Sequence, residues 1–268
     1  MTMSNGVDVA VTSMTIVERV AHVVIERPAK RNAMDRAVLD GLVEHARSAA
    51  ELVGSGAIGA VVVAGRGQHL SAGLDLADLA ALTMTPLTLD DVARVQAVFT
   101  AFEELDVPVL AAIDGVCLGA GLQLAIACHV RGVTERASLA VMEPRWGLVP
   151  DLGASWRLPR LVGQGRATEL MLSARRVDAD EAIAIGLAEV RLAGDDALAA
   201  GHELAVRWAD GPQVLQHLPR LVREAAGASR DGALAAEGRL QLRMLAGGDV
   251  SEAVTAAAQD RTPRFGGR

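Results

Sequence analysis

The chain has 268 residues, of which 51% are hydrophobic and 22% are charged, and its formal net charge is −7 at pH 7. A sequence of this length and hydrophobicity predicts one large domain with a sizeable core, or one domain with a small appendage, and excludes a disordered chain. The acidic balance, the dispersed arginines and the six aromatic residues argue against nucleic-acid binding, and the longest apolar runs are far shorter than the roughly 20 residues of a membrane span.

The start of the chain, MTMSNGVDVAVTS, has neither a basic segment nor an apolar core of about 7–15 residues, so we expect no secretory signal and a cytoplasmic protein. Cys117 and Cys128 do not form a CxxC pair, and two thiols in a chain of this length are typical of small core residues rather than of a disulfide or a metal site. His129 and Arg131 end an apolar segment and are expected to cap or solvate a helix.

The first predicted elements are two strands, a helix and a third strand. Residues 15–26 carry apolar positions on both sides of a turn near Arg19 and predict two strands. Residues 34–52 have apolar residues near helical spacing and predict a helix, after which 60–64 read as a buried strand. The long, turn-rich connection over 65–88 is expected to be partly helical, and such length often signals function.

The most informative pattern lies in residues 107–143. An apolar strand over 107–113 leads to the turn Gly119-Ala120-Gly121, where an apolar helix begins. Small residues let the backbone approach a ligand closely, and the start of a helix directs free N–H groups and the positive end of its dipole into the same space. A similar turn, Ser71-Ala72-Gly73, follows the strand at 60–64. We expect the two turns to converge on one oxyanion; alternatively, both turns need small residues only for close packing.

The order of strand, turn and helix recurs around 107–127 and less clearly around 139–172. From Ala197 onward the chain is rich in Ala, Arg and Leu and predicts successive amphipathic helices without a strand. We therefore expect residues 1–196 to form an α/β core that holds the site, and residues 197–268 to form a helical subdomain.

Five segments, in this order over most of the chain, resemble the crotonase (enoyl-CoA hydratase/isomerase) superfamily. They are ERPAKRNAM (Glu26–Met34), HLSAGLDL (His69–Leu76), AAIDGVCLGAGLQLA (Ala111–Ala125), MEPRWGLVPDLGASWRLPRLVG (Met142–Gly163) and RATELMLSARRVDADEAIAIGLAEV (Arg166–Val190). The resemblance implies a spiral of ββα units with C-terminal helices that pack against neighbours in a homotrimer or a dimer of trimers. It also implies an acyl-CoA substrate, with coenzyme A as part of that substrate and no metal or redox cofactor.

The resemblance further implies roles for individual residues. The oxyanion hole would use the backbone N–H groups of Ala72 and Ala120. Of the two glutamates that flank the double bond in the family's hydratases, the second is Glu143, whereas the first position holds Gln123, which cannot accept a proton at neutral pH. The resemblance implies three acidic residues in the family's dienoyl-CoA isomerases; Glu143 and Asp151 match two of them, whereas Gln123 stands at the position of the third. An aspartate in a loop like that of Asp151 also fits a turn or a helix cap.

In the family, residues around the first two matching segments contact the CoA moiety. This implies CoA contacts from Lys30, Arg31, Ala72, Gly73, Leu74, Asp75, Leu76 and Gly119. Lys30 is the only lysine, and because the net charge is negative we expect it to attract the CoA phosphates. A solvated surface lysine is the alternative.

These features predict an enzyme that acts on unsaturated acyl-CoA thioesters through an oxyanion-stabilised enolate. Gln123, Glu143 and Asp151 favour double-bond isomerisation. The alternatives are an enoyl-CoA hydratase of fatty acid β-oxidation, which adds water to a trans-2-enoyl-CoA, and a catalytically inactive acyl-CoA-binding protein.

Overall fold

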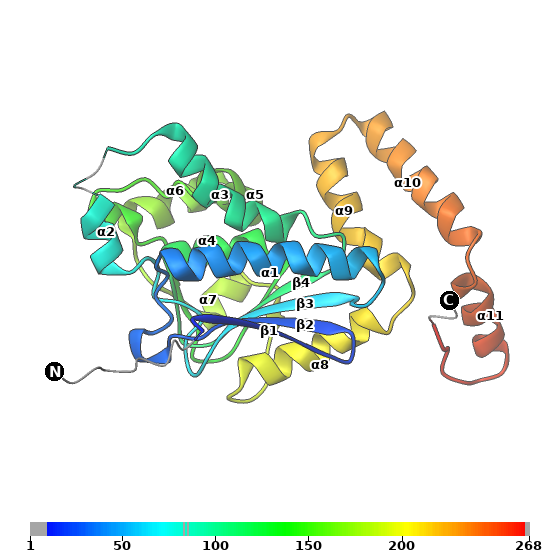
Figure 1. The fold of residues 1–268 in the computed structure, drawn as a ribbon. Coiled ribbons are helices and arrows are strands. Elements are labelled where there is room, and N and C mark those ends of the chain that lie inside the picture. The colour runs from blue at the N-terminus through cyan, green and yellow to red at the C-terminus, as the bar shows by residue number, and fades with distance from the viewer. Residues whose placement is uncertain (1–9, 83, 85, 266–268) are drawn as a thin grey trace.

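The structure is a computed structural model that describes residues 10–82, 84 and 86–265 (Figure 1). Residues 1–9, which carry most of the expectation about a secretory signal, and Thr83 and Thr85 of the long connection lie outside the described residues. Within the described ranges, no helix combines the length and the hydrophobicity that crossing a bilayer would need.

The described strands form two sheets. The larger sheet has the order β1-β2-β3-β4-β6-β9, and its strands are β1 (Thr12–Val17), β2 (Val20–Ile25), β3 (Ala60–Gly65), β4 (Val109–Ile113), β6 (Val130–Val133) and β9 (Val190–Arg191). The smaller sheet consists of β5 (Val116–Leu118), β7 (Ser138–Ala140) and β8 (Val177–Asp178). All pairings are parallel except β1 with β2 and β7 with β8.

The chain passes repeatedly from the larger sheet to the smaller one and then into a helix. The helices that follow strands are α1 (Arg36–Gly54), α2 (Leu76–Leu82), α3 (Leu89–Glu103), α4 (Ala120–Ala127), α5 (Ala154–Val162), α6 (Gln164–Ser173) and α7 (Ala179–Ala184). Thus β4, β5 and α4 follow one another, and so do β6, β7 and α5, with the 3-10 helix η2 (Glu143–Trp146) between β7 and α5. After β3, a parallel bridge from Ser71 to Cys117 takes the place of the second strand. This repetition confirms the expected spiral of ββα units.

Both faces of the central strands of the larger sheet are buried, as is typical of parallel strands, whereas the edge strand β1 is partly exposed. Val61 and Val63 of β3 belong to the main core with residues of α1, α3 and α4, whereas Val62 packs with α8 (Ala197–Ala209). Gly201 allows α8 to approach the sheet, since a Cβ at this position would lie only 3.0 Å from the Cβ of Ala112. The run 60–64 is therefore apolar at every position because neither side of the strand meets water.

After α8 the chain continues as α9 (Val214–Gly227), α10 (Arg230–Leu245) and α11 (Asp249–Ala258), which extend from the body of the molecule (Figure 1). In the described part of the chain, the prediction of successive helices without a strand after Ala197 is confirmed. Because α8 packs on β2, β3 and β4, it is structurally part of the α/β core. The division at residues 196 and 197 stays a prediction.

Candidate active site

Two backbone turns lie side by side at the edge of the smaller sheet. Ser71 N donates to Val116 O, and Leu118 N donates to Ser71 O, so the first turn is fixed along β5. Gly73 has a φ of +97°, and a Cβ there would lie 2.9 Å from Leu118 O and 3.7 Å from Ala120 N. Only glycine permits this conformation and this close approach. The structure thereby brings the first turn against the start of α4.

Some backbone N–H groups of these turns already donate a hydrogen bond, and others do not. Ala72 N donates to Arg31 O at 2.9 Å, and Gly73 N donates to Ser71 Oγ at 3.1 Å. Among the described residues, Leu74 N and Ala120 N have no hydrogen-bond acceptor. The donor role expected for Ala72 therefore does not fit, because its N–H is already used in holding the turn to Arg31. Leu74, two positions later, carries the free N–H beside Ala120.

Glu143 lies next to the second turn. It begins the 3-10 helix η2 (Glu143–Trp146), and a Cβ on Gly119 would be 3.4 Å from its Oε1. The residue is 8% exposed; Oε1 accepts a hydrogen bond of 2.6 Å from Gln123 Nε2, whereas Oε2 has no partner among the described residues. Burial raises the pKa of Glu143, hydrogen bonds from the backbone and from Gln123 partly offset this, and the charge of Asp151 raises the pKa further. A buried carboxylate with one free oxygen is suited to accept a proton.

Gln123 is buried on α4, and its amide has one orientation. Its Oε1 accepts hydrogen bonds from Leu152 N at 2.9 Å and Ala154 N at 3.1 Å. An N–H cannot donate to the amide nitrogen, so the NH₂ group must face Glu143. The amide therefore acts only as a donor toward the carboxylate.

Asp151 lies at the exposed edge of this site. Its carbonyl oxygen accepts a hydrogen bond of 2.6 Å from Gln96 Nε2, whereas its carboxylate makes no hydrogen bond within the described ranges. Its charge still contributes to the raised pKa of Glu143. The structure thus brings Asp151 near Glu143 and into water, while Gln123 and Glu143 are in direct contact.

The residues expected to meet CoA form a charged cluster beside the first turn. Asp75 Oδ2 accepts hydrogen bonds from Lys30 Nζ at 2.8 Å and Arg27 Nη2 at 3.0 Å. The pKa of Asp75 falls to about 2, mainly through the hydrogen bond from Lys30. Lys30 belongs to the 3-10 helix η1 (Pro28–Lys30), and its side chain is 58% exposed. It is therefore near the turn and partly neutralised by Asp75. Arg31 is exposed.

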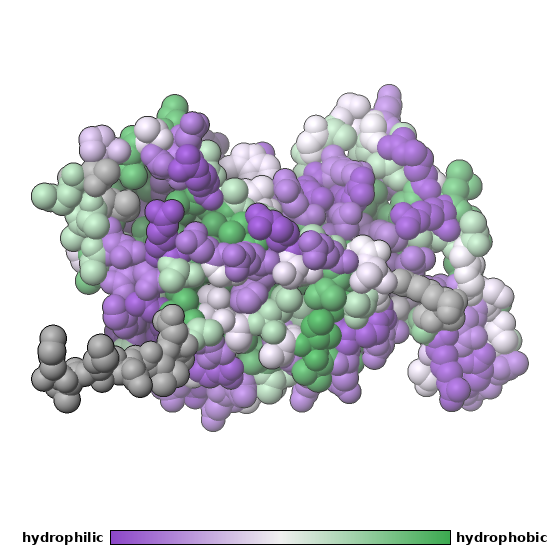
Figure 2. All heavy atoms as spheres, viewed as in Figure 1, coloured by the Kyte–Doolittle hydropathy of each residue, from purple (hydrophilic) through white to green (hydrophobic). Residues whose placement is uncertain are grey.

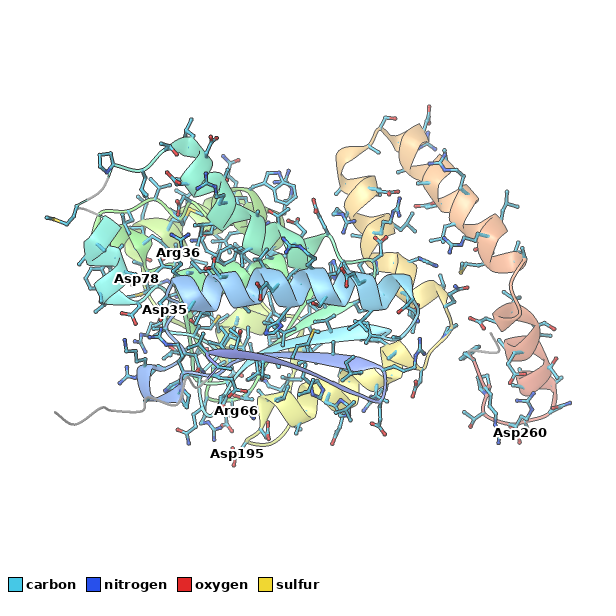
Figure 3. The ribbon with its side chains drawn as sticks, in the orientation of Figure 1. Asp35, Arg36, Arg66, Asp78, Asp195 and Asp260 are labelled. Carbon is cyan, nitrogen blue, oxygen red and sulfur yellow. The ribbon has the colours of Figure 1, made fainter. Side chains whose placement is uncertain are left out.

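The start of α2 adjoins the start of α1 and borders this cluster. Arg36 N donates to Asp78 Oδ2 at 2.9 Å, and Figure 3 shows where these two residues and Asp35 lie. Asp35 forms an ion pair of 3.0 Å with Arg27. Leu76, the first residue of α2, is exposed. Apolar residues also lie on the surface over α2 and α3, where Leu89 is exposed (Figure 2). The first turn thus adjoins both a charged cluster and the exposed apolar residue Leu76.

Several other residues have structural roles. Cys117 and Cys128 are buried free thiols, and burial raises both pKa values, as expected of core residues. His129 accepts a hydrogen bond of 3.0 Å from Val109 N, and the Arg131 guanidinium is buried in an ion pair with Glu189. The expectation that both residues cap or solvate the apolar helix is confirmed for Arg131, whose Nη1 donates to Cys128 O at the C-cap of α4 at 2.9 Å. It was wrong for His129, whose ring bonds Val109 N and Glu103 O.

The sequence reasoning missed one residue near the site, Arg157. It is 7% exposed, donates from Nη1 to Leu152 O at 2.9 Å, and forms an ion pair with Glu103. No local signal distinguishes it from the exposed Arg160 on the same helix. Its burial depends on α3, which is distant in sequence.

Comparison with known proteins identifies relatives across nearly the whole chain. Residues 15–268 match the family model described as Enoyl-CoA hydratase/isomerase. The mitochondrial Delta(3,5)-Delta(2,4)-dienoyl-CoA isomerase of Mus musculus is 40% identical over 182 residues, which are 63% of this chain and 54%, about half, of the mouse protein. The 2,3-dehydroadipyl-CoA hydratase of Escherichia coli (strain K12) is 32% identical over 252 residues, 94% of this chain and 96% of that protein.

Among solved structures, a Thermobifida fusca YX protein described as an enoyl-CoA hydratase, in complex with CoA, is 33% identical with a TM-score of 0.76. The alignment covers 88% of this chain and 93% of that one.

Proposed function

The chain belongs to the enoyl-CoA hydratase/isomerase family, and on that basis we propose that it moves a double bond in an unsaturated acyl-CoA thioester. Coenzyme A enters as part of the substrate, and the reaction needs no further cofactor. The relatives' names include both dienoyl-CoA isomerase and hydratase, so the family alone leaves the reaction open. The choice between them rests on the site of this chain.

The contact between Gln123 and Glu143 carries the proposal. Addition of water in the two-glutamate scheme of the family needs two ionisable groups, one at the water and one at the carbon. Here the partner of Glu143 is an amide that only donates to it. A double-bond shift needs a group that removes a proton from one carbon and returns it to another, and one carboxylate can do both. The buried Oε2 of Glu143, which has no partner among the described residues, is that group.

In the proposed reaction the thioester oxygen lies between the N–H groups of Leu74 and Ala120, at the start of α4. Glu143 Oε2 removes a proton from carbon 2 of a 3-enoyl-CoA, and the electrons move onto the thioester oxygen as an enolate. The two N–H donors stabilise that charge, and loss of one such donor typically costs about 3–4 kcal/mol of transition-state stabilisation. Glu143 then returns the proton to carbon 4, which leaves the double bond between carbons 2 and 3.

Asp151 has a supporting role in this scheme. Its negative charge raises the pKa of Glu143, which favours retention of the abstracted proton until it is returned. With a dienoyl substrate, whose double bonds extend further from the thioester, Asp151 is the second group for proton transfer.

Hydration is the first alternative, because a hydratase is among the relatives that match nearly the whole chain. A binding protein without activity is the second, favoured by the amide at Gln123. The presence of both Glu143 and Asp151 argues against the second.

Mass spectrometry of reactions in deuterated water tests the three functions. The substrates are enoyl-, 3-enoyl- and dienoyl-CoA, and Glu143→Gln is the matched control. Isomerisation converts the 3-enoyl-CoA into the trans-2 isomer, which chromatography separates, without adding the mass of water; deuterium enters only where the proton on Glu143 exchanges with solvent before its return. Hydration adds the mass of water, and a binding protein leaves every substrate unchanged. Water addition without isomerisation would refute the proposed reaction.

The remaining proposals concern CoA and assembly. Lys30 and Arg31 attract the CoA phosphates, and Gly73, Leu74, Asp75, Leu76 and Gly119 contact the rest of the CoA moiety. The exposed Leu242 and Leu245 on α10 support association into a homotrimer or a dimer of trimers, because isolated helices rarely leave such residues in water. The proposed compartment is the cytoplasm.

A further inference from the structure

Arg157 lies beneath the loop that holds Gln123. Its Nη1 donates to Leu152 O at 2.9 Å, and the opposite side of its guanidinium binds Glu103 Oε2 at 2.5 Å and 3.1 Å. A Cβ on Gly153 would be only 1.9 Å from Arg157 Nη1, so the loop rests directly on the guanidinium. Gly153 also has a φ of +101°, which any other residue would adopt under strain.

The same loop presents its N–H groups to the opposite side. Leu152 N and Ala154 N both donate to Gln123 Oε1, and Gln123 Nε2 donates to Glu143 Oε1. A continuous series of contacts therefore joins a buried guanidinium to the carboxylate. Arg157 is 7% exposed and Gln123 is 1% exposed, so water does not compete with the hydrogen bonds along this series.

We infer that Arg157 and Gln123 are positioning residues: Arg157 fixes the loop 152–154, this loop orients the Gln123 amide, and the amide holds Glu143 Oε1 so that Oε2 alone faces the substrate. The inference rests on one part of the proposed function, namely that Glu143 is the group that transfers the proton. It adds a residue, Arg157, that touches neither substrate nor base. It also gives Gln123 the role of a fixed hydrogen-bond donor to Glu143 Oε1, which an ionised glutamate at this position could not perform.

A purely structural role is the competing explanation for Arg157. Its ion pair with Glu103 joins α5 to α3, and this alone would stabilise the fold. The two roles differ in their effect on the Glu143 carboxyl group. A structural tie changes the melting temperature, whereas a positioning role also changes the titration of Glu143.

The test uses Gln123→Met, Arg157→Met and the double variant, with Arg160→Met as the matched control. Arg160 is on the same helix, is exposed, stacks 3.9 Å from the centre of the Trp156 ring and binds Trp156 O. The Glu143 side chain is titrated by ¹³C NMR in the free protein, with its signal assigned by its loss in Glu143→Gln. The pH dependence of kcat and KM is measured alongside.

We expect Gln123→Met to raise the Glu143 pKa, since a hydrogen bond to the charged form is lost, and to lower kcat roughly ten- to hundredfold with KM changed only a few-fold. Arg157→Met should also raise the Glu143 pKa. In the double variant, Arg157→Met should add no further shift to that of Gln123→Met alone. Arg160→Met should leave the titration unchanged. Arg157→Lys, which keeps the charge but loses the planar fork, replaces Arg157→Met should the latter fail to fold.

Two results would overturn the inference. An unchanged Glu143 titration in folded Arg157 variants would leave only a structural role. An equal shift in the Gln123→Met background would mean that the Arg157 charge acts through space and not through the amide. The NMR titration needs no substrate, so it can succeed or fail independently of the proposed isomerase activity.

Discussion

Gln123→Glu is the most informative single change because it replaces only the amide NH₂ group by an oxygen and leaves the rest of the site unchanged. One oxygen of the new carboxyl group would accept the hydrogen bonds from Leu152 N and Ala154 N that the amide oxygen now accepts. The other oxygen would take the place of the amide nitrogen, 2.6 Å from Glu143 Oε1. Two ionised carboxylates cannot share that distance, so the pair must hold one proton between them.

The size of this effect follows from the spacing. Two unit charges about 4 Å apart at an effective dielectric constant of about 20 repel by about 4 kcal/mol, a factor of roughly a thousand in the population of the doubly ionised state. The singly protonated pair therefore predominates at neutral pH. Such a pair contains one acid and one base side by side, the combination that water addition needs. We expect Gln123→Glu to add or raise hydratase activity on a short trans-2-enoyl-CoA, with a bell-shaped pH dependence.

The assay follows loss of the conjugated thioester absorbance from pH 5 to 9, with Gln123→Met as the control that removes the amide without adding an acid. A gain of at least tenfold in hydration over wild type, seen with Glu and not with Met, is the expected outcome. The reasoning fails if wild type already hydrates efficiently and Gln123→Glu is no faster. In that case the amide does not limit water addition, and the preference for isomerisation loses its main support.

Three further changes are predicted. Glu143→Gln should abolish turnover while the affinity for CoA thioesters stays within a few-fold, because it removes the proton acceptor but keeps its size; a variant with wild-type kcat would contradict the assignment. Lys30→Ala should raise KM by roughly two- to tenfold at low salt and by less at high salt, with kcat nearly unchanged. The effect on KM is modest because the ion pair with Asp75 already neutralises part of the Lys30 charge. A KM insensitive to the change at any salt concentration would identify Lys30 as a solvated surface residue. Burial and the charge of His202 lower the pKa of His22, so the unfolded chain binds more protons than the folded one just below pH 6.5. The melting temperature should therefore fall between pH 7 and 5.5, and should fall less in His22→Gln; equal slopes for the two proteins would contradict this.

The fold was largely predictable because its signals are local. The run 60–64 is apolar at every position, which only a strand buried on both faces requires, and β3 has that environment. The helix predicted over 34–52 differs from α1 by two residues at each end, since Asp35 caps the helix and the sequence pattern does not reveal which polar residue does so. The packing of α8 on the sheet was not predictable, because an Ala-rich amphipathic helix has the same pattern whether it packs on its own domain or on a neighbour.

The sequence could predict which residues lie at the site, but not which contacts each of them makes. The turn 71–73 is evident from its small residues, but whether Ala72 or Leu74 offers a free N–H depends on Arg31 O, which lies about forty positions earlier in the chain. Arg157 has the spacing of an exposed helical arginine, and its burial depends on Glu103 in α3. In each case the missing information is a contact between segments that are far apart in sequence.

The direction of one hydrogen bond therefore says more about the reaction than the fold does. Glutamine and glutamate have nearly the same shape, and Leu152 N and Ala154 N can donate to either side chain, so the backbone around position 123 does not need to change between them. Structural similarity to isomerases or to hydratases therefore does not discriminate between the two reactions for this chain. The group that faces Glu143 does. An amide always donates to it and leaves one base, whereas a carboxyl group shares a proton with it and supplies an acid as well.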